Sequence, residues 1–106
     1  MRTLPMAIDP VQQELAARVG LIGLHAATTS TAMLAAQVDA IRIAAVGHGL
    51  YPAVAVTHAI AAALARGERG ALVLGWIAIL RDAVSCDRHD APACETYAAA
   101  CSVRLN

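Results

Sequence analysis

Hydrophobic residues recur every three or four positions along most of this chain, which is the spacing of one face of an α-helix. The first such stretch follows Asp9 and Pro10. Aspartate can cap the free N–H groups of a helix start, and proline suits the first helical position. The apolar stripe of this segment is formed by Val11, Leu15, Val19, Ile22 and Ala26. The pattern therefore predicts an amphipathic helix that begins at residue 10.

A second helix is predicted from the threonine-rich residues 28–31 to about Gly47, because Ser and Thr cap helix starts and glycine closes helix ends. This segment carries two apolar faces beside a narrow polar strip at Asp39 and Arg42. One face contains Leu34, Val38, Ile41 and Ala45, and the other contains Met33, Ala36, Ala40 and Ile43. A helix that is apolar on two sides is expected in the centre of a bundle or at a subunit interface.

A third helix is predicted to begin at Pro52, after a loop that contains two glycines. Its larger side chains share one face, and alanines form a second face. The first face contains Ala53, Val56, Ile60 and Leu64, and the second contains Ala55, Ala59 and Ala62.

After a turn at residues 66–70, residues 71–85 predict a fourth helix with a broad apolar arc that includes Trp76 and Leu80. We expect this fourth helix to be the most buried.

Residues 86–90 are polar and predict a loop, after which Pro92 favours the start of a short last helix. One side of that helix is expected to contain Cys94, Tyr97, Ala98, Cys101 and Leu105. No β-hairpin signal and no internal repeat interrupts this pattern. The sequence predicts a single all-α domain over residues 1–106, a compact bundle of four main helices plus a short fifth helix.

The predicted helices offer more apolar surface than one small core can cover. A four-helix bundle usually needs one apolar stripe per helix, whereas the second and third helices each carry an additional face. Alanine-rich faces let helix backbones approach closely and lose little side-chain entropy on docking. We therefore expect a homodimer, with the face containing Ala40 or the face containing Ala59 at or near the interface. The alternative is that alanine serves helix propensity on a monomer.

Charge and composition exclude several classes of partner. Eight basic residues balance eight acidic residues, so the chain lacks the positive surplus with which proteins bind nucleic acids. Uncharged windows at residues 19–38 and 43–65 are long enough to span a bilayer, but their polar residues and many alanines disfavour insertion. The N-terminal residues do not resemble a signal peptide, and three cysteines fit a reducing compartment. These features favour a cytoplasmic location.

The C-terminal region contains one candidate metal set, Cys86, His89, Cys94 and Cys101. Thiolates and imidazole are the usual zinc ligands, yet only Cys86 and His89 have the short spacing of a ligand pair. Cys94 and Cys101 lie two turns apart on a predicted apolar stripe, where cysteine commonly packs as a small hydrophobe. We favour structural packing for these cysteines over a zinc site or a disulfide between Cys86 and one of the other two, and predict no metal and no cofactor.

No catalytic or phosphate-binding motif is present, so the sequence gives no support for an enzyme. His48 lies in the glycine-containing loop with Tyr51, and His58 is expected on the solvent side of the third helix. The loop that contains His48 is explained by the reversal of the chain, and His58 is explained as an ordinary surface histidine. The leading hypothesis is a protein that acts through protein contact, by self-association or as an accessory subunit. The alternative is a helical domain that binds a small molecule or a metal through His48, His58 or the C-terminal cysteine and histidine cluster.

Overall fold

The computed structural model describes residues 9–86 and 91–105, and these residues form helices without a β-strand. A short 3-10 turn, η1, follows the first of five α-helices. The elements are α1 (Pro10–His25), η1 (Ala26–Thr28), α2 (Thr31–Gly47), α3 (Tyr51–Ala65), α4 (Ala71–Val84) and α5 (Ala91–Leu105). The predicted all-α fold class is confirmed.

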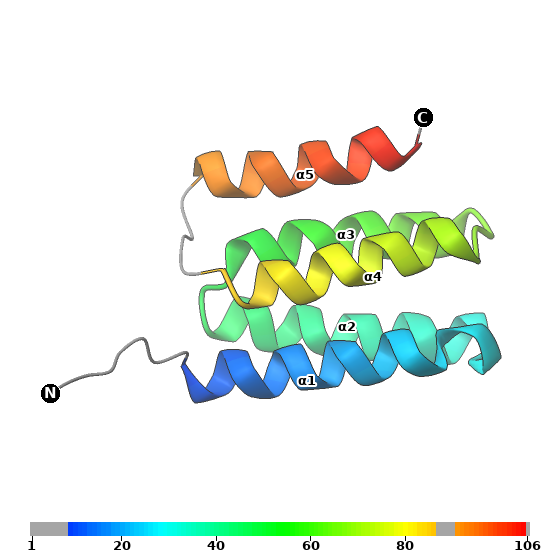
Figure 1. Cartoon of the computed structure of the whole chain (residues 1–106), viewed down its shortest axis with the longest axis horizontal. Coiled ribbons are helices and arrows are strands. Elements are labelled where there is room, and N and C mark those ends of the chain that lie inside the picture. Colours follow the sequence, from blue (N-terminus) through cyan, green and yellow to red (C-terminus); the bar gives the residue numbers. More distant parts are fainter. Residues whose placement is uncertain (1–8, 87–90, 106) are drawn as a thin grey trace, which may run out of the picture.

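Helices α1 to α4 form a four-helix bundle in which consecutive helices run in opposite directions (Figure 1). Helix α1 packs against α4, α2 packs against α3, and α3 packs against α4. Helices α1 and α2 lie together on one side of the molecule. Helix α5 lies on the opposite side, where it contacts α3 and α4 (Figure 1). One outer side of the bundle is therefore covered by α5, and the other is formed by α1 and α2.

Local capping interactions explain why the helices begin where the sequence predicts. The Asp9 carboxylate accepts a hydrogen bond from the backbone N–H of Val11 at 2.8 Å. The Ser30 hydroxyl oxygen accepts one from the backbone N–H of Met33 at 3.1 Å. In the turn between α2 and α3, Gly49 has φ 70°, a left-handed conformation that favours glycine. These starts and turns depend on neighbouring residues only, so the sequence pattern suffices to predict them.

The core is formed by apolar side chains from every helix, including Leu15 of α1, Leu34 of α2, Ile60 of α3 and Leu80 of α4. The expectation that the fourth helix is the most buried is wrong. Helix α4 buries Val73, Trp76, Ile77, Leu80, Ala83 and Val84, whereas α3 buries Pro52, Ala53, Val56, Thr57, Ile60, Ala63 and Leu64. The difference is Pro52 in the first turn of α3, because the other six buried positions of α3 have the same spacing as the six of α4. Both helices contact three others, namely α2, α4 and α5 for α3, and α1, α3 and α5 for α4.

Helix α5 differs from its prediction in length and in orientation. It was expected to be short, but its 15 residues exceed the 14 of α4. Cys101 is buried and Tyr97 is half-buried as expected, whereas Ala98 is exposed and Ala93 is buried. The covered side of the helix is therefore rotated relative to the predicted stripe, and it faces α3 and α4. The side chain of Leu105 lies outside the described residues.

The two uncharged windows do not coincide with single helices. Residues 19–38 include the end of α1, the η1 turn and the first half of α2, and residues 43–65 include the end of α2 and all of α3. Within residues 9–86 and 91–105, no helix is long and apolar enough to cross a bilayer.

Candidate functional site

The most distinctive surface of the molecule is apolar and lies on α1 and α2. Large hydrophobic side chains are exposed there, with exposed fractions of 57% for Leu21, 55% for Met33 and 59% for Ile43. We define the α1–α2 face as Leu21, Met33, Ala36, Ala40 and Ile43. Leu24 of α1 is also 74% exposed. Exposed large apolar side chains that gather on one side of a small protein are typical of an interaction surface.

A groove of about 270 Å³ runs between α1 and α2 within this surface. Leu21 lines it from α1 and Ala40 lines it from α2, and the polar side chains of Arg18, His25 and Gln37 line it as well. The groove exists because α1 packs more closely against α4 than against α2. Gly23 makes this approach possible, since a Cβ atom at that position would lie 3.2 Å from Ile77 Cγ2. The lack of a side chain at Gly23 thus lets α1 pack closely against α4, and the groove remains between α1 and α2.

The structure places the two candidate interface faces differently. Met33, Ala36 and Ile43 are exposed and Ala40 is half-buried in the groove, so these four residues share one open surface. On α3, Ala62 is exposed, but Ala55 and Ala59 are half-buried and Ala59 packs against the core. Helix α5 packs along α3, which leaves less of the alanine face accessible. The α2 face is therefore the more open of the two.

Sequence reasoning missed the contribution of α1 to this surface. Leu21 and Leu24 lie outside the apolar stripe of α1, and both side chains are exposed. The available signal was the presence of two leucines on the otherwise polar side of an amphipathic helix. Together with the α2 residues, they extend the apolar surface across two helices.

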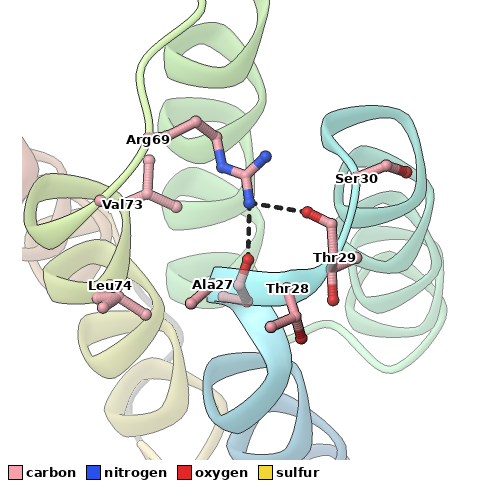
Figure 2. A pocket seen from close by; sticks show the side chains of 9 residues that line it. Ala27, Thr28, Thr29, Ser30, Arg69, Val73 and Leu74 are labelled. Carbon is pink, nitrogen blue, oxygen red and sulfur yellow. Dashed lines mark hydrogen bonds between the residues drawn. The ribbon is translucent and has the colours of Figure 1, made fainter.

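A second cavity, of about 510 Å³, lies at the end of the bundle where η1 joins α1 to α2. Figure 2 shows Arg69 inside it, with the guanidinium directed at the turn. Arg69 Nη2 donates hydrogen bonds to the carbonyl oxygens of Ala26 at 2.6 Å and Thr29 at 2.8 Å. Arg69 Nη1 donates to the Thr31 hydroxyl at 2.8 Å. Three hydrogen bonds to the chain itself indicate that this arginine holds the turn in place.

The candidate metal set is not assembled by the described residues. Cys86 and Cys94 are half-buried, Cys101 is buried, and no disulfide joins the three. His89 lies outside the described residues. Among the residues that the structure describes, no group of three His, Cys, Asp or Glu side chains could hold a metal ion. The packing role expected from the sequence fits Cys101, which is buried, whereas Cys94 is only half-buried.

The burial of the cysteines predicts their order of reactivity. We expect a thiol-labelling reagent to modify Cys101 most slowly in the native protein, because its exposed fraction is 3%. Cys86 and Cys94 are half-buried and should react faster. Mass spectrometry of proteolytic fragments at successive times measures each rate, and labelling in denaturant provides the fully accessible reference. Native labelling of Cys101 at the rate of Cys94 would contradict the described packing of α5.

The histidines named as candidates lie on different helices or at their ends. His48 follows the last residue of α2, and His58 lies in the middle of α3. Both are exposed, as expected for His58. His58 lines a small hollow of about 170 Å³ together with Asp39, Arg42 and Thr57. Arg42 there donates a hydrogen bond to Asp39 at 2.7 Å, so these two charges already neutralise each other.

Comparison of the chain with models of known protein families, with curated proteins and with solved structures found no match. The function is therefore inferred from the residues and their arrangement.

Proposed function

We propose that this protein functions by self-association, and that a second copy of the chain covers the α1–α2 face. The observation that carries this proposal is the exposure of Leu21, Met33 and Ile43 on two neighbouring helices, on the side of the bundle that α5 does not cover. Exposed apolar surface costs free energy in water, and burial of such surface is the main driving force for association. A second copy supplies an identical apolar surface.

The spacing of the α2 residues favours a two-fold arrangement. Met33, Ala36, Ala40 and Ile43 are separated by three, four and three positions, a pattern that reads the same in both directions. If α2 packs against α2 of a second copy in antiparallel orientation, Met33 of one copy lies opposite Ile43 of the other. The two alanines then lie near the crossing point, where their small side chains allow close approach of the backbones. A two-fold interface requires this kind of self-complementary surface.

The size of the surface supports a small but specific interface. With a rise of about 1.5 Å per residue, helices of this length extend for about 25 Å, and two adjacent helices are about 20 Å wide. Each copy thus contributes on the order of 500 Å², and two copies bury about 1,000 Å² together, which is about the smallest area expected of a biological interface. The groove within this surface is lined by both polar and apolar side chains, with Arg18 and His25 beside Leu21. Interfaces commonly combine apolar contacts with polar groups.

Sedimentation at micromolar concentration tests this proposal. We expect the wild-type protein to be a dimer and Ala36→Arg to be a monomer. The substitution places a charge on the α1–α2 face at an exposed position, and arginine has good helix propensity. The matched control is Ala62→Arg, at an exposed alanine of α3, which should leave the dimer intact. A wild-type monomer would overturn self-association. A dimer that persists in Ala36→Arg but dissociates in Ala62→Arg would place the interface on α3.

A further inference from the structure

Another cavity, of about 510 Å³, lies between α4 and α5. None of the residues that line it belongs to α1 or α2. Those two helices lie on the side of the bundle opposite α5 (Figure 1). Ala78 and Ile79 line the cavity from α4, and Ala93 and Ala100 line it from α5. Helix α5 packs more closely against α3 than against α4, and alanine side chains are too short to fill the remaining space. The result is an open cavity with apolar walls.

Polar side chains also line this cavity, namely Cys86, Thr96 and the hydrogen-bonded pair Tyr97 and Asp82. The Tyr97 hydroxyl of α5 donates a hydrogen bond to Asp82 Oδ2 of α4 at 2.7 Å. Burial and the neighbouring Asp82 carboxylate raise the pKa of Tyr97 above its ordinary value, because both disfavour the phenolate. The hydroxyl therefore remains protonated and keeps its role as the donor. This bond holds Asp82 Oδ2 in a fixed position at the edge of the apolar cavity.

The second oxygen of Asp82 remains available to a ligand. Within the described part of the chain, Asp82 Oδ1 accepts no hydrogen bond and Asp82 forms no ion pair. The neighbouring Arg81 does not neutralise it, because the Arg81 guanidinium packs over Gly20 of α1 and lines a different hollow. Asp82 is the charged residue among those that line the cavity, so the described lining carries a negative charge beside apolar walls. This combination is complementary to a cation that has an apolar body.

We propose that the cavity between α4 and α5 binds small organic ammonium ions. The apolar body of the ligand contacts Ile79, Ala93 and Ala100, and the ammonium group donates a hydrogen bond to Asp82 Oδ1. Pockets for small molecules are commonly apolar with a few polar groups that set orientation, and a charge-assisted hydrogen bond supplies the preference for a cation. This inference is independent of the self-association proposed above, because it uses other residues on another side of the bundle.

Cyclohexylammonium is a suitable probe, and cyclohexanol is its uncharged equivalent of similar shape. We expect titration of the isotope-labelled protein with cyclohexylammonium to shift amide NMR signals of Ala78, Thr96 and Ala100, with a dissociation constant on the order of millimolar for so small a ligand. Cyclohexanol should bind about three- to tenfold more weakly, because it cannot form the charge-assisted contact with the partly solvated carboxylate. Equal binding of the two probes, or the absence of shifts at these residues, would overturn the proposal.

Variants separate the role of the carboxylate from that of the cavity. Asp82→Asn should weaken cyclohexylammonium binding about three- to tenfold and leave cyclohexanol binding unchanged. Glu95→Gln is the matched control, because it removes an exposed carboxylate of α5 that does not line the cavity. Ala100→Leu fills the cavity and should abolish binding of both probes, with a circular dichroism spectrum that confirms the helical fold.

Equal effects of Asp82→Asn and Glu95→Gln on cyclohexylammonium binding would show nonspecific attraction and overturn the proposal. The two-probe comparison in the wild-type protein keeps it testable if a variant fails to fold.

Discussion

Leu80→Ala is expected to lower the free energy of unfolding by about 2 to 5 kcal/mol, because it leaves a cavity in the core. Leu80 has an exposed fraction of 0% and belongs to the same apolar cluster as Leu15 and Ile60. Neighbouring helices cannot close fully around the missing methyl groups, so the variant loses both transfer free energy and dispersion contacts. Denaturation by urea at one fixed protein concentration measures the difference, since self-association would make stability depend on concentration.

The matched control is Leu74→Ala, the same substitution on the same helix. Leu74 is 42% exposed, so much of its side chain is in contact with water before and after the change. Its loss should cost less than about 1 kcal/mol, as for most substitutions at the surface. Similar losses for the two variants would contradict the assignment of Leu80 to the core, and would indicate that α4 is packed differently.

The helices could be predicted from the sequence because their boundaries are set by neighbouring residues. Asp9 caps α1 through the N–H of a residue two positions later, and Ser30 caps α2 through one three positions later. The apolar stripes of α1 and α2 were likewise predicted, since each stripe lies on the side of its helix that faces the core. Capping and periodicity are short-range properties, so a single sequence contains the information that specifies them.

The arrangement of the helices could not be predicted because it depends on residues far apart in the chain. The close approach of α1 to α4 is determined by Gly23 and Ile77. Helix α5 is attached to the core by Trp76, whose indole N–H donates a hydrogen bond to the carbonyl oxygen of Cys101 at 3.1 Å. Such contacts join α1 and α5 to α4, and they set which side of α5 is covered, which the apolar pattern of that helix did not predict.

Some features of the candidate sites could likewise be predicted from local sequence, whereas others depend on long-range packing. The face of α2 with Met33 and Ile43 was visible as a second apolar stripe, and the structure places it on an open surface. The groove beside it depends on the distance between α1 and α2, which no local pattern encodes. The cavity with Asp82 and Tyr97 could not be predicted without knowing how α5 packs on α4, because these residues are 15 positions apart on different helices. Long-range packing thus creates the cavities, and local periodicity selects the faces.

Arg69 is a residue whose importance only the folded chain reveals. It lies in a turn rich in charge and glycine, where sequence reasoning assigned it no role beyond chain reversal. Its three hydrogen bonds reach residues 38 to 43 positions away and join the start of α4 to the connection between α1 and α2. Two of the acceptors are backbone carbonyl groups that are partly buried, and such groups cost free energy when they lose both water and a donor.

Arg69→Met is therefore expected to lower the free energy of unfolding by about 1 to 3 kcal/mol, because methionine keeps much of the apolar stem and removes every donor. Arg81→Met is the control, since Arg81 is exposed and its side chain forms no hydrogen bond or ion pair among the described residues. It should change the free energy of unfolding by less than about 0.5 kcal/mol.

Hydrogen exchange supplies a second measurement. Amides of residues 26–34 should exchange faster in Arg69→Met alone, because the turn has lost its long-range contact. Equal stability and equal exchange in the two variants would show that the guanidinium contacts seen in Figure 2 contribute nothing to the fold.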